Sequence, residues 1–137
     1  MNTDFLHPHL SDAEILQVSS LGLAHIGDVV YEIMTRSYIV CHGTQTAKNL
    51  HAKTVSLVRA SAQYTAAQKI IPLLTEEEQD VFKRARNTKL HGIPKAASRS
   101  EYAHATALEA LFGWLYLKKQ YDRLNELYSV ISEDFNI

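Results

Sequence analysis

The chain has only one cysteine, Cys41, among its 137 residues. A single cysteine excludes a disulfide within the chain and a zinc site built from a cysteine cluster. No apolar run approaches the roughly 18 residues that are needed to span a bilayer. The first residues, MNTDFLHPHLSDAE, also lack the basic segment and the apolar core of a secretory signal. We therefore expect a cytoplasmic protein with no membrane partner.

Signals for β-strands are also scarce, because no segment alternates apolar and polar residues cleanly. Helix-start signals recur instead, in the form of a Ser or Thr followed three residues later by Glu, the capping box. The three capping boxes are Ser11 with Glu14, Thr75 with Glu78 and Ser98 with Glu101. A chain of this length fits one domain with a single core. We expect an all-α domain of about six or seven helices that spans residues 1–137.

The spacing of the apolar residues predicts where the helices lie. Either Thr44 or Thr46 should cap the third helix, which is expected to bend or break between residues 59 and 62. Pro72 should end the fourth helix, since proline cannot continue one. Glycine and proline in residues 88–99 indicate a loop. The expected helices span residues 13–18, 20–40, 47–60, 62–74, 76–89, 101–119 and 121–132.

Two of these helices carry acidic residues in apolar surroundings. The stretch LAHIGDVVYEIM, residues 23–34, contains Asp28 and Glu32, and Glu109 is the only formally charged residue between residues 103 and 117. A buried carboxylate costs several kcal/mol unless something compensates its charge. We expect Asp28 and Glu109 to lie in the core on two helices that pack together. Facing each other, they could share Mg²⁺ or Mn²⁺, which prefer oxygen ligands.

Other interpretations of the acids remain open at this point. Asp28 could accept hydrogen bonds from the N-terminus of a neighbouring helix, and Glu109 could pair with a Lys or Arg. Glu32 is expected to be exposed or paired.

Basic residues are clustered although the net charge is only −1. Six of the fourteen Lys and Arg residues lie between residues 83 and 100, a stretch that contains no Asp or Glu. Clustering of this kind is typical of phosphate binding. The alternative is a solvated basic loop that binds nothing.

Two motifs resemble the ribonuclease III family. LAHIGDVVYE is similar to the family's signature helix, E-R-L-E-F-L-G-D-A-V-L, and ATALEALFGWLYL is similar to its second motif, D-x-x-E-A-L-I-G-A. Between them, RARNTKLHGIPKAASRSEYAHAT resembles the basic connecting segment of the short branch called Mini-ribonuclease III, which has no double-stranded-RNA-binding domain. We expect no such domain here either. Three acidic positions of the family are occupied by Leu21, Ala24 and Thr106, which is typical of that branch.

The resemblance implies a ribonuclease III endonuclease-domain fold and hydrolysis of double-stranded RNA, with 5′-phosphate and 3′-hydroxyl ends. Asp28 and Glu109 fall on family positions that bind the catalytic Mg²⁺, for which Mn²⁺ is expected to substitute. The residues expected to contact RNA are Lys83, Arg84, Arg86, Asn87, Lys89, Lys95 and Arg99. The resemblance to this branch further implies that the chain matures the precursor of the large-subunit (23S) ribosomal RNA. It also implies a homodimer, and a ribosomal protein that presents the substrate is a further expected partner. The rival interpretations are an inactive RNA-binding or ribosome-associated module and an unrelated helical interaction domain.

Overall fold

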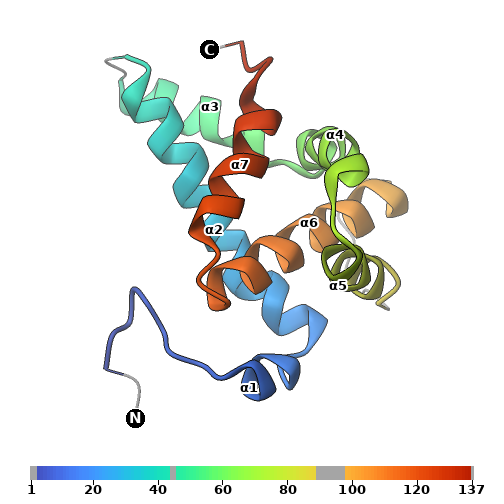
Figure 1. The fold of residues 1–137 in the computed structure, drawn as a ribbon. Helices are drawn as coiled ribbons and strands as arrows, with labels where there is room; N and C mark the ends of the chain where they lie inside the picture. The colour runs from blue at the N-terminus through green and yellow to red at the C-terminus, as the bar shows by residue number, and fades with distance from the viewer. Residues whose placement is uncertain (1–2, 44–45, 89–97, 137) are drawn as a thin grey trace.

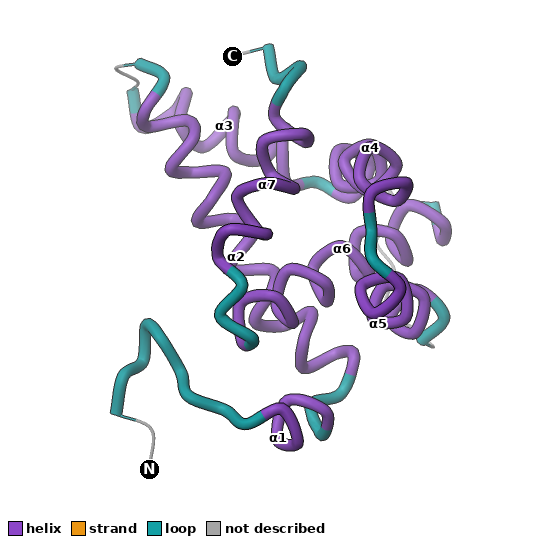
Figure 2. The backbone as a smooth tube through the Cα atoms, in the orientation of Figure 1, coloured by secondary structure: helices purple, strands orange, loops and turns teal. Residues whose placement is uncertain are grey.

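The computed structural model describes residues 3–43, 46–88 and 98–136, and all regular structure in these ranges is helical. This confirms the all-α prediction. Figures 1 and 2 show the helices and the short loops that join them. The helices are α1 (Asp12–Leu16), α2 (Ser20–Cys41), α3 (Ala47–Val58), α4 (Ala60–Ile70), the 3-10 helix η1 (Ile71–Leu73), α5 (Glu76–Arg86), α6 (Arg99–Leu117) and α7 (Tyr121–Ser132). In these ranges no helix is long and apolar enough to cross a membrane.

Local side-chain chemistry sets most helix starts. All three expected capping boxes form, at the N-termini of α1, α5 and α6. Thr46 caps α3 by accepting a hydrogen bond from the backbone N–H of Asn49. The expected break between α3 and α4 lies at Arg59, whose extended backbone (φ −64°, ψ 157°) ends one helix and begins the next. The fourth helix ends at Ile70, and Pro72 lies in the 3-10 turn that follows.

Helix α6 occupies the centre of the fold, with α2, α4, α5 and α7 packed around it (Figure 1). Its buried residues point in every direction around the helix, as expected for a helix that is apolar nearly all round. Several of them are small, among them Ala105, Ala107, Ala110 and Gly113. Small side chains let neighbouring helices approach closely, and the closest approach is made by α2.

The crossing of α2 and α6 depends on two glycines. A Cβ atom on Gly27 would lie 1.6 Å from the carbonyl oxygen of Glu109. A Cβ atom on Gly113 would lie 2.0 Å from the carbonyl oxygen of Leu23. Both obstacles are backbone atoms, which no rotamer change can move. The two helices are therefore in backbone contact at this point, and only glycine fits on either side.

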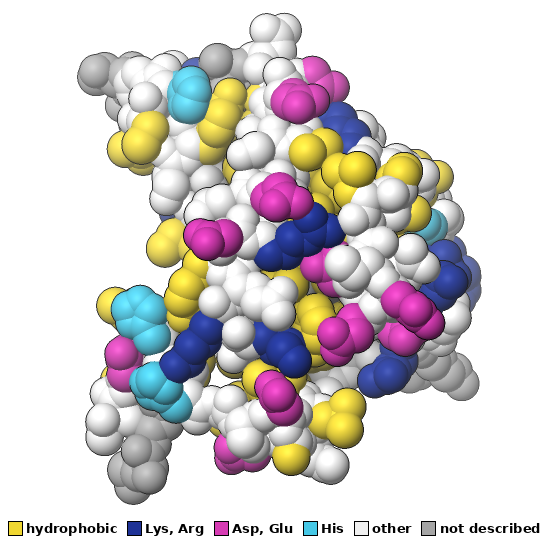
Figure 3. Space-filling model, in the orientation of Figure 1, with side chains coloured by type: hydrophobic (Ala, Val, Ile, Leu, Met, Phe, Trp, Pro, Cys, Tyr) yellow, Lys and Arg dark blue, Asp and Glu magenta, His cyan; other side chains and the backbone are white. Residues whose placement is uncertain are grey.

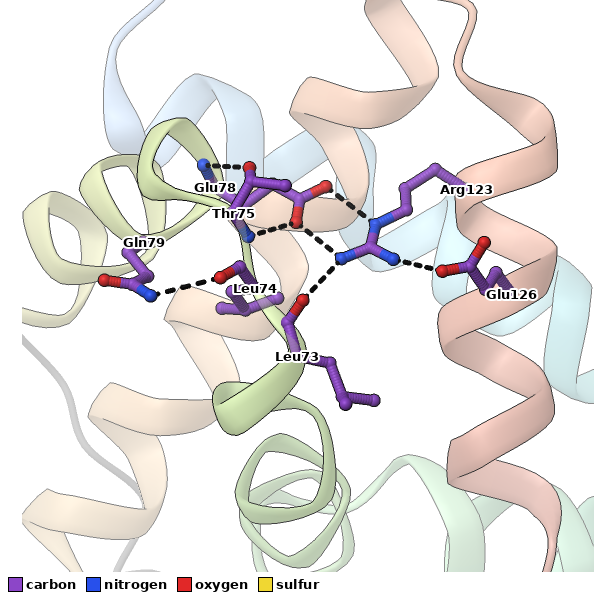
Figure 4. A network of polar contacts seen from close by, with 7 residues as sticks. All are labelled: Leu73, Leu74, Thr75, Glu78, Gln79, Arg123 and Glu126. Atoms are coloured by element: carbon purple, nitrogen blue, oxygen red, sulfur yellow. Dashed lines mark hydrogen bonds and ion pairs between the residues drawn. The ribbon is translucent and has the colours of Figure 1, made fainter.

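A partly buried ion pair fixes α5 against α7 (Figure 4). The guanidinium of Arg123 donates to both carboxylate oxygens of Glu78, at 2.9 and 2.8 Å, and to the carbonyl oxygen of Leu73 at 2.8 Å. Burial acts to raise the pKa of Glu78, but the hydrogen bonds from Arg123 and Thr75 and the charge of Arg123 outweigh it, so the pKa is lowered. A lowered pKa means that this carboxylate stabilises the fold at neutral pH and loses that effect as the solution becomes acidic.

Replacement of Gly27 by alanine tests the backbone contact. Gly27→Ala should lower the free energy of unfolding by about 3 kcal/mol or more, because the helices must separate to admit the new methyl group. Urea denaturation measures this change. Gly22→Ala is the matched control on the same helix, since its Cβ would meet only side-chain atoms, the nearest being Val18 Cγ1 at 3.1 Å. The control should change stability by less than about 1 kcal/mol. Wild-type stability of Gly27→Ala would contradict the contact.

Candidate active site

The helix crossing brings Asp28 and Glu109 together. Asp28 follows Gly27 on α2, and Glu109 supplies the carbonyl oxygen that faces Gly27 from α6. Their carboxyl groups are close enough for Asp28 to raise the pKa of Glu109. Two residues 81 positions apart in the sequence thus meet because the backbones that carry them touch.

The two acids differ in burial, which corrects one prediction. Both were expected in the core, but the side chain of Asp28 is exposed and that of Glu109 is partly buried. The reason is helical geometry: consecutive residues point about 100° apart around a helix. Since Gly27 faces α6, Asp28 lies at the rim of the contact and reaches solvent. The pair therefore forms a site that is open on the Asp28 side.

Glu109 is held in an environment that disfavours its charged form. Burial, the negative charge of Asp28 and the hydrogen bond with Asp28 together raise its pKa to about 8. A hydrogen bond from Gln63 acts in the opposite direction. Among the described residues, no Lys, Arg or His forms an ion pair with either acid. The predicted alternative in which Glu109 pairs with a basic residue is therefore not seen in this part of the chain.

Gln63 is a neighbour of the pair that sequence reasoning missed. Its side chain on α4 is only 2% exposed, and its Nε2 donates to Glu109 Oε2 at 3.4 Å. The spacing of apolar residues in the sequence does indicate that Gln63 is buried. Gln63 precedes Ala66, Ala67 and Ile70 at helical spacing, so it lies on the buried face of α4. A polar residue on such a face needs a hydrogen-bond partner.

The donor set of this pair suits a hard divalent cation. Two carboxylates supply only oxygen, and Mg²⁺ is often held by one or two carboxylates together with water and substrate phosphates. In the described ranges, no group of three or more His, Cys, Asp and Glu side chains gathers in one place, so a site made entirely of protein ligands is not seen there. Mutual repulsion of the acids gives a physical reason for a cation to bind between them.

Comparison with known proteins places the chain in a family. The family model of the Ribonuclease III domain matches residues 21–120. The chain belongs to this family. Mini-ribonuclease 3 of Symbiobacterium thermophilum is 43% identical over 115 residues, which cover 84% of this chain and 88% of that protein. Mini-ribonuclease 3 of Clostridium tetani is 41% identical over 132 residues, covering 96% and 87%. Family membership makes the chain an endoribonuclease.

A solved structure agrees with this assignment. The crystal structure of a Fusobacterium nucleatum protein superposes on this ribonuclease III domain with a TM-score of 0.79 at 32% identity. The superposition covers 85% of this chain and 95% of that chain. The predicted ribonuclease III fold is thereby confirmed.

The other acid of α2 has a local partner. Glu32 forms an ion pair with Arg36 one turn later, at 2.9 Å. The expectation that Glu32 is exposed or paired is confirmed, and this residue is separate from the Asp28–Glu109 pair.

The described residues that were expected to contact RNA lie at two helix ends. Lys83, Arg86 and Asn87 lie at the C-terminus of α5, and Arg99 is the first residue of α6. Arg99 belongs to the helix rather than to the expected loop. Arg99 lies ten positions before Glu109, which corresponds to about 15 Å along a helix. Lys89 and Lys95 lie outside the described residues.

Arg84 has different surroundings from the other basic residues. It lines a cavity of about 140 Å³ together with Glu77, Asp80 and Trp114. Acidic side chains in the same cavity would repel a phosphate, so we expect Arg84 to contribute less to phosphate binding than Lys83. On the face drawn in Figure 3, basic side chains alternate with acidic ones rather than forming one basic surface.

The raised pKa of Glu109 predicts a metal-sensitive stability profile. Without divalent ions, the folded protein should lose stability between pH 4.5 and about 8, because the folded state keeps a proton that the unfolded chain releases. Mg²⁺ should raise the Tm most at or above pH 8, where the ionised pair is most costly. Calorimetry at several pH values measures both effects. Glu109→Gln should abolish this part of the pH dependence and the response to Mg²⁺. An equal Mg²⁺ response in wild type and variant would contradict a site at Glu109.

Proposed function

We propose that this chain is a magnesium-dependent endoribonuclease that hydrolyses double-stranded RNA and leaves 5′-phosphate and 3′-hydroxyl ends. The observation that carries the proposal is the contact between Asp28 and Glu109, two carboxyl groups at the rim of a helix crossing with no basic side chain paired to them in the described part of the chain. Such a pair is costly by itself and becomes favourable when a divalent cation binds.

Asp28 and Glu109 would hold the ion, and Mn²⁺ is expected to substitute for Mg²⁺. The bound ion would supply the Lewis acid that phosphodiester hydrolysis requires. The protein's own part is placement: α6 presents Glu109 from the core, and α2 presents Asp28 from the solvent side. The open side of the pair is where an RNA phosphate can approach.

The basic helix ends would bind the RNA backbone. A-form RNA exposes phosphates and 2′-hydroxyls along its minor groove, so recognition depends on these groups rather than on base edges. Lys83, Arg86 and Arg99 suit phosphates, and Asn87 could reach a 2′-hydroxyl. Lys89 and Lys95 belong to the same proposed segment.

A second copy of the chain would allow both RNA strands to be cut. Of the four large apolar side chains of α2 that are exposed, Leu21 (50%) lies near the helix start, and the other three are Val29 and Ile33 at 62% each and Val40 at 63%. They share one stripe of the helix, since they are four and seven residues apart. Figure 3 shows hydrophobic side chains along the edge of the molecule where Figure 1 places α2. We propose that this stripe is the homodimer interface. Because Val29 adjoins Asp28, the two active sites would lie beside it.

The proposed substrate is the precursor of 23S ribosomal RNA, cut at its double-stranded stem in the cytoplasm. The support is similarity to proteins named Mini-ribonuclease 3 across most of the chain. A ribosomal protein that presents the stem is part of this proposal. Mapping the cleavage sites on precursor ribosomal RNA tests it, and cleavage outside the stem would contradict it.

Removal of either carboxylate should abolish cleavage. Asp28→Asn and Glu109→Gln should each lower kcat/KM on a long RNA duplex by at least about a hundredfold, a loss typical for a group that stabilises a transition state. Single-turnover assays in Mg²⁺ measure this. Glu32→Gln is the matched control on α2 and should retain activity. Equal activity of all variants would contradict the proposed site, and RNA binding without cleavage by the wild type would favour an inactive RNA-binding module.

Binding of RNA should weaken steeply with salt. With six or more phosphate contacts, affinity is expected to fall on the order of a thousandfold between about 50 and about 200 mM salt. Measurements in Ca²⁺, with a duplex of fixed length, separate binding from cleavage. Lys83→Gln should flatten the salt dependence, whereas Arg84→Gln should change it less, because Arg84 lies beside Glu77 and Asp80. A flat salt dependence in the wild type would contradict the assignment of the basic segment.

A charge in the apolar stripe should separate the copies. Ile33→Glu is expected to sediment as a monomer, because the carboxylate would have to be desolvated in the interface. Leu73→Glu, on η1 and 48% exposed, is the matched control that should leave the dimer intact. If the wild type is itself a monomer at micromolar concentration, the proposed interface is wrong.

A further inference from the structure

Gln63 contributes a polar group to the candidate active site from a third helix. Its neighbours on the inner face of α4 are Ala66, Ala67 and Ile70, all buried at 4% exposure or less. Transfer of an amide into such surroundings is unfavourable unless its hydrogen bonds are made. The side chain meets this requirement through Glu109, 46 residues away, to which its Nε2 donates at 3.4 Å.

Glu109 needs orientation because its side chain is long and flexible. A glutamate that moves among several rotamers must be ordered before it can bind a cation, and this ordering costs free energy. A donor on one carboxylate oxygen restricts the rotation. The hydrogen bond to Oε2 leaves the remaining lone pairs of the carboxylate available for a metal ion.

An uncharged donor suits this position better than a basic one. A Lys or Arg in place of Gln63 would neutralise Glu109 and compete with a divalent cation. The amide fixes the carboxylate without removing its charge. Tyr31 also lies near Glu109, yet its buried hydroxyl makes no hydrogen bond within the described ranges. Gln63 is thus the side-chain amide that the protein directs at this carboxylate.

The backbone that carries Gln63 is well fixed. The break at Arg59 sets where α4 begins, and Ala67 and Ile70, both at 0% exposure, pack α4 into the core beside α6. We expect a side chain near the start of such a helix to stay in place when Glu109 binds a metal ion. This is the geometry by which a residue behind a metal ligand tunes the ligand.

We propose that Gln63 is a positioning residue that orients Glu109 for binding of the divalent cation. The inference rests on the proposed metal site and goes beyond it, because it assigns a role to a residue that touches neither cation nor RNA. Loss of such a residue typically weakens metal affinity by about tenfold to a hundredfold.

The test replaces Gln63 by methionine, which has a similar shape but no N–H donor. Titration of the RNA-free protein with Mn²⁺, followed by calorimetry or electron paramagnetic resonance, should show about tenfold to a hundredfold weaker binding. The Mg²⁺ concentration for half-maximal cleavage should rise in parallel, while KM for RNA at saturating Mg²⁺ stays unchanged. Gln63→Asn keeps the amide but is too short to reach Glu109, so it should show the same loss of Mn²⁺ affinity. Agreement between the two variants would show that the loss does not come from a folding defect of the methionine variant.

Gln79→Met is the matched control, because Gln79 Nε2 also donates a hydrogen bond, to the carbonyl oxygen of Leu74 at 3.1 Å, but on α5. This variant should bind Mn²⁺ like the wild type. Wild-type Mn²⁺ affinity in both Gln63 variants, combined with its loss in Glu109→Gln, would overturn the positioning role and leave the metal site standing. If the wild type binds Mn²⁺ no better than Glu109→Gln, the proposed metal site fails, and the role of Gln63 fails with it.

Discussion

The backbone contact between α2 and α6 is the constraint on which the rest of the structure depends. Without Cβ atoms at Gly27 and Gly113, two helices meet at a separation that any other residue would prevent. This contact places Asp28 beside Glu109 and leaves almost no room for adjustment between them. The candidate site therefore lies at a close-packed helix crossing, which suits carboxylates that must hold an ion in a fixed geometry.

Two carboxylates, the buried Glu78 and the partly buried Glu109, differ in how their charge is compensated. Glu78 receives two hydrogen bonds from Arg123 and one from the Thr75 backbone, so its negative charge is satisfied within the fold (Figure 4). Among the described residues, the neighbours that affect Glu109 are the amide of Gln63 and the acid Asp28, and the pKa of Glu109 is raised. The first carboxylate supports the packing of α5 and α7. In the described part of the chain, no basic side chain compensates the charge of Glu109, and this is the physical basis of the proposed magnesium site.

Much of the fold could be predicted from the sequence because helix ends depend on neighbouring residues. The capping boxes at Ser11, Thr75 and Ser98, and the cap at Thr46, involve groups only three residues apart. The two acids of the candidate site could also be picked out from the sequence, since Asp28 and Glu109 interrupt apolar helices. The exposure of Asp28 was not predictable, because it depends on which side of α2 faces α6.

The sequence by itself determined the helical class, the helix starts and the identity of the two acids, since these follow from residue type and short-range spacing. Only the tertiary structure decided that Asp28 lies near Glu109 and that Gln63 reaches Glu109. The physical reason is that such contacts join different helices. The distances between such residues depend on how closely their helices pack. Here Gly27 and Gly113, which are far apart in the chain, set the distance between α2 and α6.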